Sequence, residues 1–137
     1  MADRMKLDIL TPRGPKRQGI DVPGVEIPGL LGELGVLPEH VPFVTAVRPG
    51  VVRFKEGSES VRLAVGAGFL EVTDAGRVVL LCERALAPEE IDAEAARTRL
   101  REVEAELARY SGPITAATFR DLDQERMWLE AQIRCAS

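Results

Sequence analysis

Residues Ile27–Gly50 read IPGLLGELGVLPEHVPFVTAVRPG and mix proline and glycine with apolar side chains in the first half of the 137-residue chain. Proline and glycine at this density usually form turns, whereas the residues between them are ones that proteins tend to bury. Two interpretations follow. The stretch is either a packed Ω-like connection over a β-rich core or a rigid surface loop that docks a partner.

On both sides of this stretch the sequence has the short patterns of β-strands. Met5–Leu10 alternates apolar residues, expected to face inward, with Lys6 and Asp8, expected to face solvent. Two hairpins are predicted around glycine-containing turns: Val51–Phe54 with Val61–Val65, and Phe69–Thr73 with Arg77–Cys82. Short strands with Gly and Pro between them predict a β-sandwich or a flattened barrel.

The composition changes after Leu86. The first 86 residues hold 11 of the 12 glycines and 13 of the 14 valines, with 11 basic and 11 acidic residues. The last 51 residues hold 7 basic and 11 acidic residues and are rich in Ala, Glu, Arg and Leu, which favour helix. The sequence therefore predicts a β-domain over 1–86 and a helical hairpin over 87–137.

The hairpin is expected to consist of two helices. The first begins at Ala87-Pro88, where proline suits the first turn, and ends at Ser111-Gly112-Pro113. The second begins at Thr118, with Asp121 in the manner of a capping box. Each helix has one predicted apolar face, which needs the other helix, the β-domain or another protein as cover.

Several classes of function are disfavoured. A net charge of −4 argues against a nucleic-acid or anionic-membrane binder, and no run approaches the ~18 apolar residues of a membrane span. No phosphate-binding GxxxxGK[ST] loop is present, and His40, the single histidine, supports neither a zinc site nor a catalytic triad. Cys82 is expected to be a buried inert thiol and Cys135 to lie near a fraying end. These features predict a non-enzyme without a cofactor.

Ile27–Gly50 also carries a family resemblance. From Pro28 to Arg53 the chain follows the pattern PG…GELGVLPGHxPxxT…PGxxR, with Glu39 where glycine is common, and Gly66–Val72 resembles a GGFLEV strand pair. The chain therefore resembles the epsilon subunit of F-type ATP synthases. The resemblance implies an α+β fold, in which an N-terminal ten-stranded β-sandwich precedes a C-terminal antiparallel helix–loop–helix hairpin.

The resemblance also implies a function and partners. Epsilon subunits are non-catalytic parts of the central rotor stalk, at the cytoplasmic face of the bacterial inner membrane, and associate with the membrane only through the complex. The sandwich is expected to bind the gamma subunit and the c-ring, and the hairpin to extend toward the alpha and beta subunits and inhibit ATP hydrolysis. The implied rotor contacts are Gly32, Glu33, Leu34, Gly35, Val36 and His40. The available inhibitory contacts are Arg120, Arg126 and Arg134.

ATP-binding members of the family share a pattern [IL]-D-x-x-R-A at the start of the hairpin. Here Ile91, Asp92 and Ala96 match, but Ala95 replaces the arginine and offers no donor to a phosphate. The resemblance therefore implies weak or absent ATP binding. Two alternatives to a rotor subunit stay open at this point: an ATP-sensing module and a free-standing sandwich–hairpin adaptor.

Overall fold

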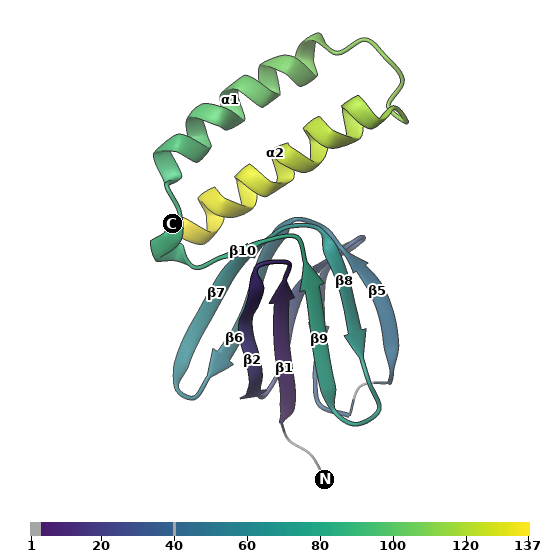
Figure 1. The fold of residues 1–137 in the computed structure, drawn as a ribbon, viewed down its shortest axis with the longest axis vertical. Helices are drawn as coiled ribbons and strands as arrows, with labels where there is room; N and C mark the ends of the chain where they lie inside the picture. The colour runs from purple at the N-terminus through teal and green to yellow at the C-terminus, as the bar shows by residue number, and fades with distance from the viewer. Residues whose placement is uncertain (1–3, 40) are drawn as a thin grey trace.

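The computed structural model describes residues 4–39 and 41–137, so the predicted contact His40 lies outside the described residues. Ten strands form the sandwich, and a short 3₁₀ turn and two helices follow (Figure 1). The elements are β1 (Met5–Thr11), β2 (Gly14–Val22), β3 (Val25–Gly29), β4 (Gly32–Val36), β5 (Phe43–Val47), β6 (Gly50–Glu56), β7 (Glu59–Val65), β8 (Gly68–Val72), β9 (Arg77–Cys82), β10 (Ala85–Leu86), η1 (Pro88–Glu90), α1 (Ala93–Arg109) and α2 (Ala117–Ala136). The predicted fold class is confirmed.

The strands form one continuous sheet that curves into the two layers of the sandwich (Figure 1). The order of neighbours is β10-β7-β6-β3-β5-β8-β9-β1-β2, with β4 attached to β3. Both predicted hairpins are present, as the antiparallel pairs β6–β7 and β8–β9. Among the described strands only β1 and β9 pair in parallel. The hairpin of helices lies across one end of the sandwich.

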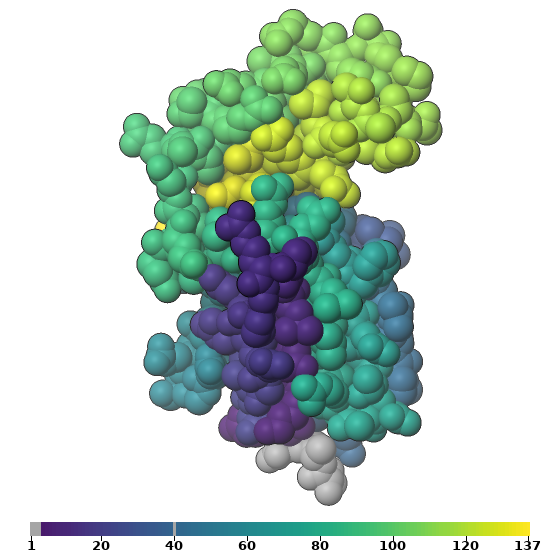
Figure 2. All heavy atoms as spheres, in the orientation of Figure 1, coloured from purple at the N-terminus to yellow at the C-terminus, as the bar shows by residue number. Residues whose placement is uncertain are grey.

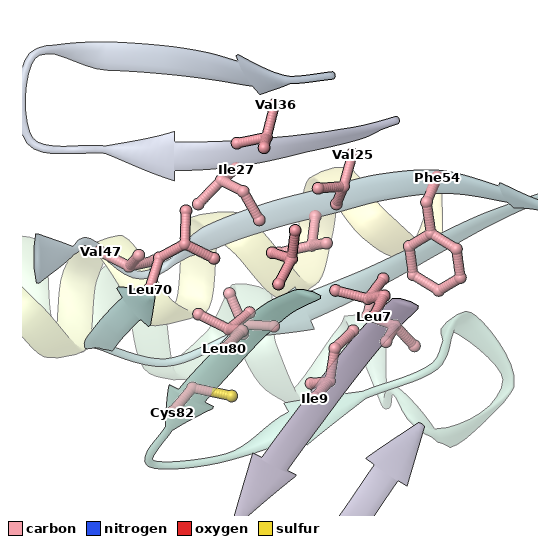
Figure 3. Packing of buried hydrophobic residues seen from close by; sticks show 14 of the residues in the cluster. Leu7, Ile9, Val25, Ile27, Val36, Val47, Phe54, Leu70, Leu80 and Cys82 are labelled. Carbon is pink, nitrogen blue, oxygen red and sulfur yellow. The ribbon is translucent and has the colours of Figure 1, made fainter. Parts of the chain in front are cut away.

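Alternate residues of the strands fill the space between the layers (Figure 3). The largest fully buried side chains of this core include Leu7, Ile9, Ile27, Leu63, Leu70 and Leu80. The expectation that Asp8 faces solvent is wrong, because its exposed fraction is 4%. Leu7 and Ile9 both face the core, so Asp8 stays on the outer side of β1, where the register with β2 shifts. Arg77 and the Gly19 backbone N–H then satisfy its carboxylate.

The stretch Ile27–Gly50 is neither an Ω-like connection nor a surface loop, and both interpretations are corrected. It contains the β3–β4 hairpin, the whole of β5 and the start of β6. Its prolines and glycines lie mainly at strand ends and turns, and the strands β4 and β5 are each five residues long. Ile27, Val36 and Val47 are inward-facing core residues of these strands. Other apolar residues of the stretch are exposed: Leu30, Leu31, Leu37, Val41 and Val44.

The helix boundaries differ from the predicted ones. After Ala87 the chain makes one 3₁₀ turn, and α1 begins only after Asp92, whose side chain accepts a hydrogen bond from the Ala95 backbone N–H at 3.0 Å. The predicted capping box at Thr118 is absent, because α2 begins one residue earlier and Ala116, its N-cap, has no capping side chain. The N-cap residue Asp92, rather than Pro88, therefore determines where α1 starts.

Helix α2 has two apolar faces, and the expectation of one is wrong. One face packs on α1, where Leu129 contacts a cluster containing Ala96 and Val103. The other packs on β6 and β7, where the buried residues are Trp128, Ala131 and Cys135 from α2 with Val51 and Ala64 from the strands. Figure 2 shows α2 between α1 and the sandwich. Cys135 is fully buried and does not lie at a fraying end.

Candidate partner-binding surface

The outer face of β5, β8 and β9 carries large apolar side chains that the chain itself does not cover. Val44, Phe69 and Leu81 are 67%, 61% and 53% exposed. The register places Phe69 beside Ala46 on β5 and beside Leu81 on β9, and Leu81 beside Leu10 on β1. These four residues form a row directly across four strands. We call this row together with Val44 the outer apolar face.

A groove of about 700 Å³ separates the outer apolar face from α2. Its lining is mostly apolar and includes Leu10, Leu30, Phe69, Leu81 and Met127, with Gln124 beside Met127 on the helix. Arg48 and Glu83 also line it. The guanidinium Nε of Arg48 donates a hydrogen bond of 3.0 Å to the Gly29 carbonyl, which holds the base of the β3–β4 turn beside the groove.

The β3–β4 turn presents two leucines to solvent. Leu30 is 57% exposed and Leu31 is fully exposed. Gly32 has a φ of +127°, a conformation that glycine adopts without strain, and this allows the chain to reverse directly into β4. The tip therefore adds apolar surface at the end of the sandwich nearest the helices.

The predicted rotor contacts Gly32–Val36 form a strand, β4, rather than a loop. In the described part of the chain β4 pairs only with β3, so its other edge is open. Glu33 and Gly35 are exposed, Leu34 is half-buried against the core, and Val36 is fully buried. Of the predicted set in β4, only the residues on the exposed side are available to a partner without a change of structure.

The three predicted inhibitory arginines are not gathered into one patch. Arg120 donates a hydrogen bond to the Thr115 carbonyl at 2.8 Å. Arg126 pairs with Asp123 and Glu130 on its own helix, at 2.7 and 3.0 Å, and the bond to Asp123 raises its pKa above the ordinary value. Arg134 is exposed and forms no ion pair within the described residues.

The predicted nucleotide motif serves as a structural element of α1. Asp92 caps the helix, Ala96 is buried against α2, and Ile91 packs at the edge of the α2–sandwich contact. Ala95 is exposed beside a hollow of about 350 Å³ whose lining includes Asp92, Glu94, Thr98, Arg99 and Glu102. The guanidinium in this lining belongs to Arg99, which donates hydrogen bonds to the carboxylates of Glu125 and Glu102. The hollow is therefore unsuited to an anionic ligand.

The described residues contain no cluster of three His, Cys, Asp or Glu side chains that could hold a metal ion. Burial raises the pKa of the Cys82 thiol to about 11, and the predicted inert thiol is confirmed as buried. No helix in the described ranges is long and apolar enough to cross a bilayer.

The outer apolar face is not among the sites predicted from the sequence. A signal was present, because the strand RVVLLC at Arg77–Cys82 is apolar at Val79 and Leu81 as well as at the inward positions Val78 and Leu80. A strand that is apolar on both faces is expected to be covered on both faces. The helical hairpin packs on β6 and β7, and Phe69 and Leu81 on the outer face remain more than half exposed.

Comparison with known proteins agrees with this architecture. The beta-sandwich domain family of the ATP synthase Delta/Epsilon chain matches residues 4–88. The ATP synthase epsilon chain of Geobacter metallireducens is 35% identical over 133 residues, which cover 97% of this chain and 95% of that one. The chain belongs to the epsilon-chain family of F-type ATP synthases. The epsilon chain of Desulforamulus reducens is 40% identical over 108 residues, covering 78% and 80% of the two chains.

Two solved structures share the fold. A chain of the Euglena gracilis mitochondrial ATP synthase, solved as an OSCP/F1/c-ring assembly, superposes with a TM-score of 0.83 at 23% identity, covering 99% of this chain and 82% of that one. A chain of the Tetrahymena thermophila central stalk and c-ring gives a TM-score of 0.64 at 11% identity, with coverages of 97% and 96%. The resemblance read from the sequence is confirmed, and the family's members are subunits of an enzyme complex.

Proposed function

We propose that this chain is the non-catalytic rotor subunit that joins the gamma subunit to the c-ring in the central stalk. In this role it couples proton flow through the ring to ATP synthesis in the catalytic head. It works at the cytoplasmic face of the bacterial inner membrane and is held there only through the complex. The observation that carries the proposal is the outer apolar face beside a groove of about 700 Å³.

We assign the outer apolar face to the gamma subunit. Val44, Phe69 and Leu81 are each more than half exposed, and monomeric proteins rarely leave a contiguous apolar patch of large side chains uncovered. The face lies on strands that are rigidly paired on both sides, so its shape is set before binding. A stiff, preformed contact is suited to a part that transmits torque.

We assign the c-ring contact to the β4 edge. Glu33 and Gly35 are exposed there, and the open edge of β4 offers backbone N–H and carbonyl groups to a polar partner. Glu33 and the open backbone edge make a polar surface distinct from the outer apolar face. Leu34 and Val36 support the strand from inside.

The hairpin is the regulatory part of the proposal. Arg134 and Arg120 are exposed and available to the alpha and beta subunits, whereas Arg126 is neutralised by Asp123 and Glu130. We therefore infer that the hairpin inhibits ATP hydrolysis only modestly. The acid-lined hollow beside Ala95 gives no support to an ATP-sensing role.

Binding to the gamma subunit of the same organism tests the assignment. Phe69→Asp puts a charge in the middle of the outer apolar face, and we expect gamma to bind at least about tenfold more weakly because that charge must be desolvated. Ser58→Asp adds the same charge on the exposed β6–β7 turn and is the matched control. If Phe69→Asp binds gamma as tightly as Ser58→Asp, the face is not the gamma contact.

A further inference from the structure

Two arginines face each other on the β6–β7 hairpin. Arg53 on β6 and Arg62 on β7 are directly opposed in the antiparallel register. Like charges at facing positions of a β-ladder destabilise the pair unless a negative group lies between or over them. Glu26 on β3 faces Arg53 from its other side and supplies a carboxylate there. The acceptors of the Arg62 guanidinium come from another part of the molecule.

The last turn of α2 supplies the negative groups. The Arg62 guanidinium donates from Nε to the Cys135 carbonyl at 2.6 Å and from Nη2 to the Ser137 carbonyl at 3.1 Å. Carbonyls in the last turn of a helix have no partner within it and form the negative end of the helix dipole. Burial raises the pKa of the Cys135 thiol, and the positive charges of Arg62 and Arg53 oppose that rise.

The remaining contact between α2 and the strands is small and apolar. Trp128, Ala131 and Cys135 cover Val51 and Ala64, and Arg84 lies over the Trp128 ring with its Cζ 4.6 Å from the ring centroid. Two of the three buried α2 residues are small, so they add little apolar area beside Trp128. The forked, charge-assisted contact at Arg62 is a second, directional contact at this end of α2.

We propose that Arg62, opposed by Arg53, is a latch that holds the helical hairpin on the sandwich by binding the last carbonyls of α2. When the hairpin leaves the sandwich, the Arg62 guanidinium loses its two carbonyl acceptors, and it regains them when α2 returns. The latch thus favours the docked arrangement and is the point at which docking is controlled.

Cysteine reactivity in the intact chain tests the latch. Cys135 is fully buried between α2 and the sandwich, whereas Cys82 is buried in the sandwich core. The two thiols therefore report separately on undocking of the hairpin and on unfolding of the sandwich. The rate at which each thiol reacts with an aromatic disulfide reagent is measured under native conditions, and mass spectrometry assigns the site. We expect Arg62→Gln to raise the Cys135 rate about tenfold and to leave Cys82 unchanged. Lys55→Gln removes a cation from β6 that forms no hydrogen bond or ion pair with α2 within the described residues, and we expect no effect.

The direction of the effect separates undocking from simple electrostatics. Removing the positive charge of Arg62 makes the Cys135 thiolate less favourable, which by itself slows the reaction. An increase in rate therefore requires greater access. Equal Cys135 rates in Arg62→Gln and the unmodified chain would overturn the proposal, and so would an equal acceleration of Cys82 and Cys135.

Arg62→Lys provides a second variant if Arg62→Gln does not fold. It keeps the charge but loses the fork, so we expect a Cys135 rate between those of the unmodified chain and a released hairpin. If Cys135 reacts at the same rate in Arg62→Lys as in the unmodified chain, the two hydrogen bonds from the Arg62 guanidinium do not hold the hairpin. All measurements use the isolated chain without gamma, so failure of the latch leaves the assignment of the outer apolar face untouched.

Discussion

The Arg99 guanidinium on α1 donates two hydrogen bonds to the Glu125 carboxylate on α2, from Nε to Oε2 at 2.8 Å and from Nη2 to Oε1 at 3.0 Å. Such bidentate pairs hold both partners in one orientation, so this pair fixes how the two helices lie against each other. Glu102 and Glu106, also on α1, lie 3.1 and 3.6 Å from the same guanidinium. The hairpin therefore has its own connection between helices, independent of the sandwich.

This pair predicts a dependence of stability on pH. The hydrogen bond from Arg99 lowers the pKa of Glu125 below its ordinary value of 4.5. A carboxylate with a lowered folded-state pKa stabilises the fold above its unfolded-state pKa and loses this contribution as pH falls through the folded-state value. Because the pair is partly exposed, we expect Glu125→Gln to lower Tm at pH 7 by only about 1–2 °C.

Thermal unfolding followed by circular dichroism from pH 7 to pH 3 checks this expectation. The Tm difference between the unmodified chain and Glu125→Gln should shrink toward zero at the acid end. A difference that stays constant over the whole range would show that the contribution of Glu125 is not ionic.

Substitution of Asp8 is expected to have a larger effect on the free energy of unfolding. Its buried carboxylate accepts from the Arg77 guanidinium at 2.6 and 3.1 Å and from the Gly19 N–H at 2.6 Å. Asp8→Ala leaves these donors without an acceptor, and we expect a loss of about 2–4 kcal/mol in the free energy of unfolding. Urea unfolding measures it. Asp21→Ala, which breaks the exposed Lys6–Asp21 pair, is the control and should cost less than about 1 kcal/mol; equal losses for the two variants would contradict the structural role of Asp8.

Substitution by aspartate is expected to have different effects on stability and assembly at Leu31 and at Leu34. Leu34 packs against the core, so Leu34→Asp should lower stability by about 1–3 kcal/mol and is a poor probe of partner binding. Leu31 is fully exposed, so Leu31→Asp should leave Tm unchanged and still weaken assembly with the complex. Tm and recovery of the assembled stalk are measured on both variants, and normal assembly of Leu31→Asp would remove the β3–β4 tip from the contact surface.

A fragment of residues 1–86 is expected to fold alone and to bind gamma. The main core draws on the strands and Ala87, and β10 closes against β7 within this range. The fragment should have a lower Tm than the full chain, because Val51 and Ala64 lose the cover of Trp128 and Ala131. A cooperative melt and gamma binding are the measurements. A melt without a cooperative transition would show that the hairpin is an integral part of the core.

ATP should bind the intact chain too weakly to matter in the cell. Ala95 offers no donor, the adjacent hollow is lined by Asp92, Glu94 and Glu102, and Arg99 is held by Glu125. Isothermal titration calorimetry of the chain with ATP checks this, and Ala95→Arg should increase the affinity. Micromolar binding by the unmodified chain would contradict the expectation.

Local sequence patterns were sufficient for β1, for the β6–β7 and β8–β9 hairpins and for the two helices, but not for the strands within Ile27–Gly50. The alternation in Met5–Leu10, the glycine-containing turns before Val61 and Arg77, and the Ala/Glu/Arg/Leu-rich tail each act within a few residues, so strands, hairpins and helices could be assigned without knowing their neighbours. The motif from Pro28 to Arg53 was sufficient for the family.

Side-chain environments depended on contacts between distant parts of the chain. Asp8 is buried because Arg77, 69 residues away, covers it on the outer side of β1, and Cys135 is buried because α2 returns to β6 and β7. The second apolar face of α2 and the uncovered row at Phe69 and Leu81 exist only once the hairpin lies on one part of the sandwich and leaves another open. Periodicity reports which side of an element is apolar, whereas packing between elements decides which apolar side is covered and which remains for a partner.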